Sequence, residues 1–265
     1  MSELKSKTAA RKSGRPLTRA GRARGRGTRV DGRVLVVAGS DSGGGAGIQA
    51  DIKTVTALGG YAMTAVTALT AQNTQGVNGI IETPGGFIAK QMRLVLRDIG
   101  ADVIKIGMVP NAEAIEAVHY AYMEYAAEVP IVVDPVMVAK GGHPLIDRDA
   151  VHLVRQHFLL SARIATPNIP EAEVLTGMEI RSLEDMKHAA EIMMTLGCQA
   201  VLLKGGHLPG KDIYDVLCDE TGVEVFQDRR IETVHTHGTG CTLASAIATS
   251  LAQRLSLRDA VVRAR

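Results

Sequence analysis

Residues 34–51 read VLVVAGSDSGGGAGIQAD, an apolar β-branched run that passes through a glycine-rich turn into a helix-forming stretch. A short run that is apolar throughout, such as 34–38, is typical of a strand buried on both faces. Similar strands are predicted at 103–106, 131–133, 163–165 and 201–203, and helices at 46–58, 86–99, 112–126, 149–159 and 183–196. This alternation predicts an α/β fold, a three-layer α/β/α sandwich around a mostly parallel sheet.

Composition indicates one large globular domain. The chain has 265 residues, 46% of them hydrophobic, with no internal repeat or interdomain linker, and 214–218 and 222–226 are expected to form a hairpin around the turn 219–221. No apolar run approaches the ~20 residues that a membrane span requires. The three cysteines are too few and too scattered for a disulfide framework, which favours a cytoplasmic location.

Charge separates the first 33 residues from the rest. They hold 11 of the 30 basic residues but 2 of the 28 acidic ones, so the remaining chain is mildly acidic at −7. Because 1–33 lacks apolar periodicity, we expect a disordered basic extension before a domain spanning 34–265. Its Arg-Gly run fits an arm that touches RNA backbones, a solubilising tail, or a transit peptide; no apolar core of a secretory signal is present.

Ligands of parallel α/β sheets collect beyond the carboxyl ends of the strands. The first such loop, Gly39 to Gly47, is glycine-dense enough for the backbone to approach a small ligand, and Asp51 lies about one helical turn beyond it. Its glycines do not have the G-x-G-x-x-G spacing of a dinucleotide site. The second loop is expected at 68–74, where the Gln72 amide can both donate and accept a hydrogen bond, which matches a heterocycle with a ring nitrogen beside an amino group.

Charged and amide side chains follow the later strands. Asp134 ends a buried strand, a usual position for a carboxylate that holds Mg²⁺, and Lys140 after it could meet a phosphate. Asn168 and Glu171 lie three apart, which suits either one Mg²⁺ shell or a helix N-terminal cap. Lys204 fits either a triphosphate-neutralising cation or a solvated residue.

Thr236 to Cys241 read THGTGC and run directly into the apolar helix-forming stretch 242–248. A glycine-rich turn at a helix start presents unpaired N–H groups and the positive end of the helix dipole to an anion. The same field stabilises a thiolate, so Cys241 is a candidate base that takes a proton from an attacking hydroxyl. A glycine turn followed by a small buried cysteine is the alternative.

The order of these segments resembles the ribokinase-like kinases. Within them, the chain from about Val34 to its end is similar to the hydroxymethylpyrimidine/phosphomethylpyrimidine kinases of thiamine biosynthesis, in which a cysteine replaces the usual aspartate base. The resemblance implies a kinase that uses ATP and Mg²⁺. Its substrates would be 4-amino-5-hydroxymethyl-2-methylpyrimidine and then the monophosphate of that compound.

The resemblance also implies roles for individual residues. Gln72 would bind the pyrimidine, with Gly39, Ala46, Thr70, Met108 and Val136 around it and Asp51 nearby. Asp134 and Glu171 would serve the metal. Asn168, Glu171, Lys204, Thr236 and Lys140 would serve the nucleotide. Gly238, Thr239, Gly240 and Cys241 would form the anion hole and base. Relatives are commonly homodimers, so a homodimer is expected.

The chain departs from the family pattern at both ends and at Thr70, and two alternative functions remain. The basic extension precedes the usual start of the family, and the chain stops inside a final helix where the family usually continues, so the usual C-terminal end is expected to be missing. Thr70 stands where several relatives have an aliphatic residue. Pyridoxal kinase is the alternative activity within the superfamily; a catalytically impaired binding protein with an RNA-touching arm is the alternative outside it.

Overall fold

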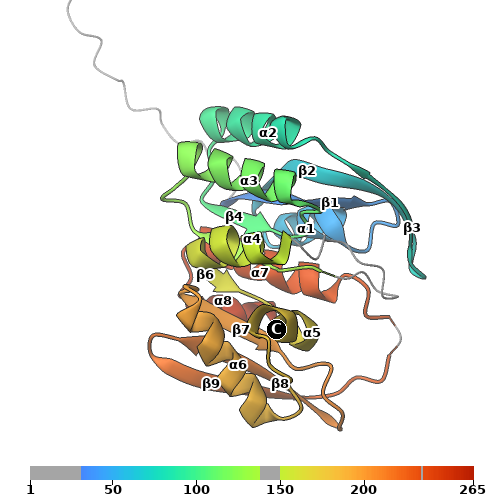
Figure 1. Ribbon diagram of the computed structural model, residues 1–265, viewed down its shortest axis with the longest axis vertical. Helices are drawn as coiled ribbons and strands as arrows, with labels where there is room; N and C mark the ends of the chain where they lie inside the picture. The colour runs from blue at the N-terminus through green and yellow to red at the C-terminus, as the bar shows by residue number, and fades with distance from the viewer. Residues whose placement is uncertain (1–30, 138–149, 234) are drawn as a thin grey trace, which may run out of the picture.

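A computed structural model describes residues 31–137, 150–233 and 235–265 (Figure 1). In this part of the chain, one nine-stranded sheet has the order β3-β2-β1-β4-β5-β6-β7-β8-β9. The strands are β1 (Arg33–Asp41), β2 (Tyr61–Gln72), β3 (Val77–Glu82), β4 (Val103–Ile106), β5 (Ile131–Val133), β6 (Ala162–Ala165), β7 (Ala200–Lys204), β8 (Asp212–Asp219) and β9 (Gly222–Arg229).

The six central strands from β2 to β7 pair in parallel, whereas β3, β8 and β9 pair antiparallel at the two sides. The carboxyl ends of the parallel strands therefore meet at one edge of the sheet. The predicted hairpin is confirmed, and each of its strands is longer than expected because β8 and β9 continue outward with paired residues from Asp212 to Arg229.

Helices cover both faces of the sheet (Figure 1). One layer holds α1 (Gly47–Ala57), α7 (Thr239–Ala252) and α8 (Leu257–Ala264). The other layer holds α2 (Gly85–Asp98), α3 (Ala112–Tyr125), α4 (Val151–Leu153), the π-helix η2 (Val154–Phe158), the 3-10 helix η3 (Leu159–Ser161), α5 (Ile169–Thr176) and α6 (Leu183–Thr195). The three-layer α/β/α prediction is confirmed.

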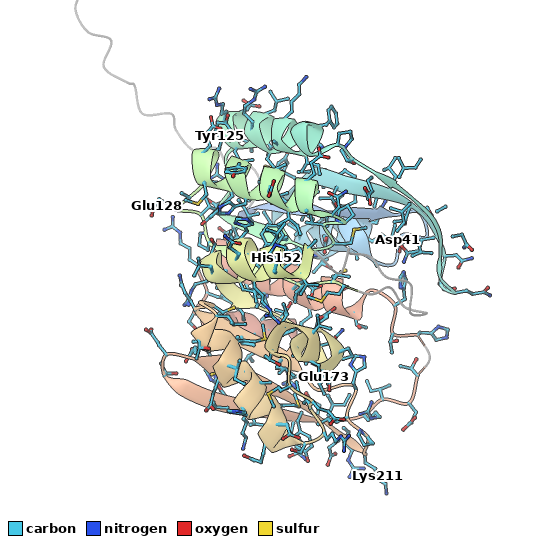
Figure 2. The ribbon with its side chains drawn as sticks, viewed as in Figure 1. Asp41, Tyr125, Glu128, His152, Glu173 and Lys211 are labelled. Atoms are coloured by element: carbon cyan, nitrogen blue, oxygen red, sulfur yellow. The ribbon has the colours of Figure 1, made fainter. Side chains whose placement is uncertain are left out.

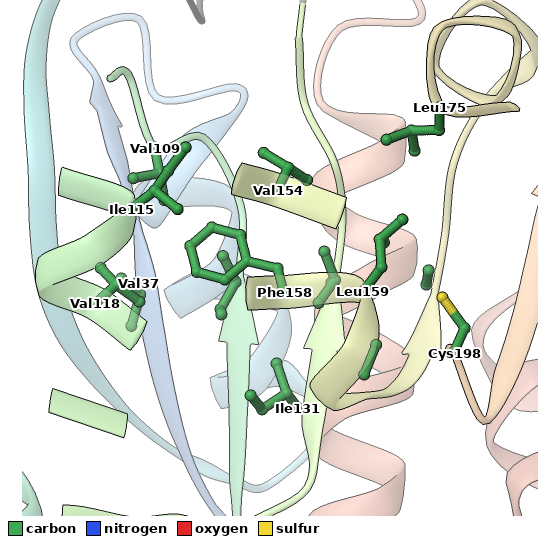
Figure 3. Packing of buried hydrophobic residues seen from close by; sticks show 14 of the residues in the cluster. Val37, Val109, Ile115, Val118, Ile131, Val154, Phe158, Leu159, Leu175 and Cys198 are labelled. Atoms are coloured by element: carbon green, nitrogen blue, oxygen red, sulfur yellow. The ribbon is translucent and has the colours of Figure 1, made fainter. Parts of the chain in front are cut away.

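The core divides between the two faces because strand side chains alternate. Along β1, Leu35 and Val37 join the cluster under α2 to α6, while Val34 and Val36 join the cluster under α1, α7 and α8. Figure 3 shows the first cluster, in which Phe158 packs among buried aliphatic side chains from neighbouring elements. Burial of both faces explains why residues 34–38 of β1 and all of β5 are continuous apolar runs.

Two sequence predictions of local structure were wrong. Residues 68–72 are not a loop but the end of β2, which pairs with β1 and with β3; the Thr- and Ala-rich sequence of β2 lacks the apolar run that marked the other strands. Residues 149–159 do not form one helix, because helical hydrogen bonding changes from α to π and then to 3-10 between Val151 and Ser161.

The folded domain begins before the predicted boundary at residue 34. Arg33 is the first residue of β1, and its backbone and guanidinium both bond to the Asp102 carboxylate. The N–H of Tyr61 donates to the carbonyl of Gly32. The rest of the expected basic extension, residues 1–30, lies outside the described residues. None of the described helices is long and apolar enough to span a membrane.

Candidate active site

A cleft of about 1620 Å³ opens along the carboxyl edge of the parallel strands. Sites for one small ligand usually measure about 300–1,000 Å³, so this cleft has room for two ligands. Most of the residues predicted from the sequence line it: Gly39, Ala46, Thr70, Gln72, Met108, Asp134, Val136, Asn168, Glu171, Lys204, Thr236, Gly238, Thr239, Gly240 and Cys241. The fold therefore brings together motifs that are separated by up to two hundred residues of sequence.

Two predicted residues do not belong to the described lining. Asp51 is fully buried behind the cleft, where Lys105 Nζ lies 3.0 Å from its Oδ1 and the Ser245 hydroxyl donates to the same oxygen at 2.6 Å. Direct contact of Asp51 with a ligand is therefore not supported, because α1 directs this side chain toward β4 and α7. Lys140 lies outside the described residues.

The start of α7 forms one wall of the cleft. Gly238 precedes the helix with a left-handed φ of +79°, and no side chain caps the first turn. The Thr239 N–H donates to the Thr236 carbonyl, whereas the N–H groups of Gly240 and Cys241 have no hydrogen-bond partner among the described residues and are available to an anion in the cleft. The long connection from β9 carries this segment across to the N-terminal end of α1, on the right of Figure 1.

Cys241 occupies the first turn of α7 as a partly exposed free cysteine. The expectation of a stabilised thiolate is wrong for the ligand-free protein. Burial raises the pKa of the Cys241 thiol to about 11, the charges of Asp51 and Asp134 add to this effect, and Lys105 opposes it. Cys241 is therefore a neutral thiol at neutral pH before substrates bind.

Thr70 orients the side chain of Gln72 at the end of β2. The Thr70 hydroxyl lies 2.9 Å from the Ser40 carbonyl oxygen and 3.0 Å from Gln72 Oε1. The hydroxyl of Ser42 accepts a hydrogen bond from the Gln72 N–H and donates to the Gln72 carbonyl. These contacts join the glycine-rich loop to the strand that carries Gln72 and hold its amide at the cleft.

Asp134 lies just beyond β5 and is almost wholly buried. Its Oδ1 accepts from the Thr166 hydroxyl at 3.0 Å and from Lys204 Nζ at 3.1 Å. Burial acts to raise the pKa of Asp134, but the charges of Lys204 and Lys105 outweigh it, so the pKa lies below its usual range. Asp134 is therefore an anion that faces the cleft, and Lys204 is its partner rather than a solvated residue.

Glu171 closes a capping box at the start of α5. Its carboxylate accepts from the Asn168 N–H, and the Asn168 side chain accepts from the Glu171 N–H, so the capping interpretation of these residues is confirmed. Burial, aided by the negative charge of Asp134, raises the pKa of Glu171 to about 7. A carboxyl group in that state would lose a proton readily if a cation entered the cleft.

The donor set suits a magnesium ion that arrives with phosphates. Within the described ranges, no three His, Cys, Asp or Glu side chains are grouped to hold a metal by themselves. Mg²⁺ commonly needs only one or two carboxylates, because it keeps waters and binds substrate phosphates. Asp134 and Glu171 supply two buried carboxylates to one cleft, and the raised pKa of Glu171 is an electrostatic strain that a cation would relieve.

Three site residues were missed by the sequence analysis. Asp41 and His237 line the cleft and meet at 2.9 Å, and buried Lys105 lies beneath Cys241. Asp41 belonged to the quoted glycine-rich loop and His237 to the THGTGC segment, but nothing in a linear sequence pairs residues 196 positions apart. Lys105 stands within a buried strand, where a charge signals a buried partner.

Known proteins resemble this chain over the same region. A model of the phosphomethylpyrimidine kinase family matches residues 41–265. The thiamine biosynthesis bifunctional protein ThiED of Geobacter sulfurreducens is 54% identical over 88% of this chain, and the chain spans 48% of that protein. The hydroxymethylpyrimidine/phosphomethylpyrimidine kinase of Streptomyces coelicolor is 46% identical, with 86% of this chain and 84% of that protein covered.

A solved structure shows that the similarity extends to the fold. The ADP complex of Bacillus subtilis pyridoxal kinase superposes with a TM-score of 0.81 at 35% identity, covering 88% of each chain. The superposition agrees with the ribokinase-like architecture expected from the order of the motifs. The match of the family model to most of the chain, together with the identity to named relatives, shows that the chain belongs to the phosphomethylpyrimidine kinase family.

Proposed function

We propose that this chain is an ATP-dependent kinase of thiamine biosynthesis that phosphorylates the hydroxymethylpyrimidine and then its monophosphate. The observation that carries the proposal is the shared cleft. It holds an oriented glutamine amide, Gln72, and an uncapped helix start at Gly238 to Cys241, with volume for an alcohol and a nucleotide side by side. Family membership and the names of the relatives point to the same activity.

The pyrimidine would lie against Gln72. With Oε1 turned toward the Thr70 hydroxyl, the Gln72 amide nitrogen is left to meet a ring acceptor. Gly39, Ala46, Met108 and Val136 line the same cleft and would surround the small ring with backbone and apolar surface. This arrangement would direct the substrate hydroxymethyl group toward the start of α7.

The phosphates of ATP would lie between α7 and the buried charges. The first-turn N–H groups of α7 and the Lys204 ammonium supply positive potential, which phosphoryl transfer requires because charge spreads over the transferring oxygens. Asn168 and Thr236 also line the cleft and would contact the nucleotide. Asp134 and Glu171 would hold Mg²⁺, which neutralises phosphate charge when it is bound.

Cys241 is the proposed acceptor of the substrate hydroxyl proton. It lies in the anion-binding turn, where an attacking alcohol and the transferring phosphoryl group must meet. With a pKa of about 11 in the ligand-free protein, Cys241 is a strong base once deprotonated, but few molecules are deprotonated at neutral pH. The proposal therefore requires bound substrates to lower this pKa.

The test is ADP release by the full chain with Mg-ATP and, separately, the hydroxymethylpyrimidine, its monophosphate and pyridoxal. Turnover of both pyrimidines above that of pyridoxal is expected. A preference for pyridoxal would instead support pyridoxal kinase activity, the alternative that the structural likeness to a pyridoxal kinase suggests. Absence of ADP release with all three substrates would overturn the kinase proposal and favour a binding protein. RNA affinity that depends on salt and is lost on deletion of residues 1–30 would then identify the basic extension as the RNA-binding segment.

Replacement of Cys241 tests its role within that experiment. We expect Cys241→Ala to lower kcat by about 10²–10⁴, the usual contribution of a positioned base. Cys218→Ala is the matched control, because Cys218 is buried in β8 away from the cleft lining. Equal kcat for Cys241→Ala and the control would remove Cys241 from the mechanism.

We also propose that the protein acts as a cytoplasmic homodimer with no membrane association. The scattered free cysteines of the described domain suit a reducing compartment. Light scattering coupled to gel filtration would give the mass in solution. A single-chain mass at micromolar concentration would contradict the dimer.

A further inference from the structure

Asp41 organises the glycine-rich loop from a buried position at the end of β1. One carboxylate oxygen accepts from the Gly43 N–H at 2.7 Å; the other accepts from the N–H groups of Gly45 and Ala46 at 3.0 and 2.8 Å. These bonds satisfy donors at the start of α1, which has no cap from its own N-cap residue, Ala46. Figure 2 marks Asp41 near the N-terminal end of α1.

His237 reaches the same carboxylate from the opposite wall of the cleft. Its Nε2 lies 2.9 Å from Asp41 Oδ2, and only 13% of its side chain is exposed. The pKa of Asp41 lies below its usual value, because the bonds from His237 and the three backbone N–H groups outweigh the effect of burial. The carboxylate is therefore charged at neutral pH, which strengthens each of these bonds.

The two loops also touch through their backbones. A Cβ on Gly238 would lie 1.7 Å from the Gly45 carbonyl oxygen, and a Cβ on Gly45 would lie 2.5 Å from the His237 ring. Neither glycine can therefore gain a side chain while the loops stay in place. The contact between Asp41 and His237 thus sits within a closely packed junction between the start of α1 and the start of α7.

This junction connects the proposed substrate residue to the proposed phosphate site. On one side, Ser42, next to Asp41, exchanges two hydrogen bonds with the backbone of Gln72. On the other side, Gly238, next to His237, sets the first turn of α7, which carries Cys241. Gln72 is therefore connected to Cys241 by a continuous series of contacts, each of which is a hydrogen bond, a packing contact or a covalent link between neighbouring residues.

We propose that Asp41 and His237 form a latch that couples pyrimidine binding at Gln72 to phosphate binding at the start of α7. His237 is a positioning residue in this proposal, and its Nε2–H acts by donating a hydrogen bond to the Asp41 carboxylate. A pyrimidine that orders the glycine-rich loop would, through the latch, order the anion-binding turn, so that pyrimidine and nucleotide each tighten the binding of the other. The coupling rests on the proposed function.

The latch can be tested by replacing His237 with an amide residue whose side-chain nitrogen either does or does not reach the position of His237 Nε2. The side-chain nitrogen of glutamine can reach the position of His Nε2, whereas that of asparagine corresponds to Nδ1 and falls short. His237→Gln should therefore keep the bond to Asp41, and His237→Asn should lose it. His235→Asn is the matched control, because the exposed His235 lies two residues away and outside the cleft lining.

The measurements are kcat for the hydroxymethylpyrimidine and the Kd of AMP-PCP with and without that pyrimidine. We expect His237→Asn to lower kcat about tenfold, because the loss of one hydrogen bond to a charged group corresponds to a factor of about ten or more. The Kd of AMP-PCP should then be the same with and without the pyrimidine. His237→Gln and His235→Asn should stay within about threefold of the unchanged protein. A fall in His237→Gln equal to that in His237→Asn, or unchanged coupling in His237→Asn, would overturn the latch.

Amide hydrogen exchange separates this test from that of the function. In the ligand-free protein, His237→Asn should speed exchange at 43–46, while His237→Gln should not. If the unchanged protein fails to turn over any pyrimidine, the proposed function fails, and this exchange result still decides whether the bond between His237 and Asp41 holds the glycine-rich loop in place. Equal exchange in both variants would contradict it, provided that their melting temperatures agree.

Discussion

Lys105 Nζ lies 3.0 and 3.1 Å from the two carboxylate oxygens of Asp51, and neither side chain has any exposed surface. The Ser245 hydroxyl completes the cluster at 2.6 Å, so β4, α1 and α7 meet at one buried ion pair directly behind the cleft. Asp51 holds the pKa of Lys105 above its ordinary value despite burial, so Lys105 is charged. Burial also raises the pKa of Asp51, and the charge of Lys105 and the Ser245 hydroxyl oppose that effect, so the pair is held together by an ammonium and a carboxylate that depend on each other. The two helices whose N-termini flank the proposed reaction site are thus tied to the sheet.

Removal of one member of this pair should be more harmful than removal of both. Lys105→Met leaves the Asp51 carboxylate buried with only Ser245, and we expect a loss of about 3–5 kcal/mol in the free energy of unfolding. Adding Asp51→Asn should restore at least half of that loss. Urea denaturation measures both, with exposed Lys90→Met as the control. Equal losses in the single and double variants would show that the charges are not coupled.

Gly238→Ala should prevent the cleft from forming. The added Cβ would lie 1.7 Å from the Gly45 carbonyl, and φ is +79°, which strains any residue with a side chain. We expect a loss of more than about 2 kcal/mol in stability and near-complete loss of kinase activity. Gly86→Ala is the control, because no atom lies within 4 Å of its Cβ position. Matching melting temperatures for the two variants would contradict this packing.

Glu171→Gln should stabilise the ligand-free protein increasingly as the pH rises above ~4.3, and the full effect should be reached just above pH 7. The native pKa of Glu171 is about 7, whereas an unfolded glutamate titrates near ~4.3. Between these values the native state holds a proton that the unfolded state has released, so this group lowers stability as pH rises through the window. A glutamine stays neutral and retains an acceptor for the Asn168 N–H.

Calorimetry in magnesium-free buffer would measure that effect. The difference between the two pKa values corresponds to roughly 3–4 kcal/mol, and 1 kcal/mol shifts Tm by about 2–4 °C in a domain of this size. We therefore expect the melting temperature of Glu171→Gln to exceed that of the unchanged protein by about 5–15 °C at pH 8 and by no more than about 2 °C at pH 4.5. Activity should fall at both pH values. A Tm difference that is the same at pH 4.5 and pH 8 would show that Glu171 does not titrate abnormally.

Alkylation of Cys241 should be slow at neutral pH and should accelerate well into the alkaline range. The thiolate is the reactive form, and a pKa of about 11 keeps its population small at pH 7. Iodoacetamide labelling at pH 7 to 10, followed by mass spectrometry of the peptide with Cys241, gives the profile. The buried Cys198, whose pKa burial raises to about 12, is an internal reference. A plateau in Cys241 labelling below pH 8 would contradict the raised pKa.

The sequence predicted correctly those strands in which every residue is buried. The strands at 103–106 and 131–133 were placed correctly because both are short and buried on both faces, and Lys105 is the one charged residue in either of them. The hairpin after residue 212 was found from its alternation and turn. By contrast, β2 was read as ending in a loop, because its Thr and Ala side chains take their roles from β1 and β3 on either side.

The sequence by itself determined the layered α/β architecture, and most residues that line the cleft, since each motif follows a strand and parallel strands end at one edge. Only the tertiary structure decided how these residues are charged and paired. Asp51 turned inward to Lys105, Cys241 became a neutral thiol, and Asp41 met His237. Burial and the distances between charges set protonation and pairing, and both arise only when distant segments of the chain pack together.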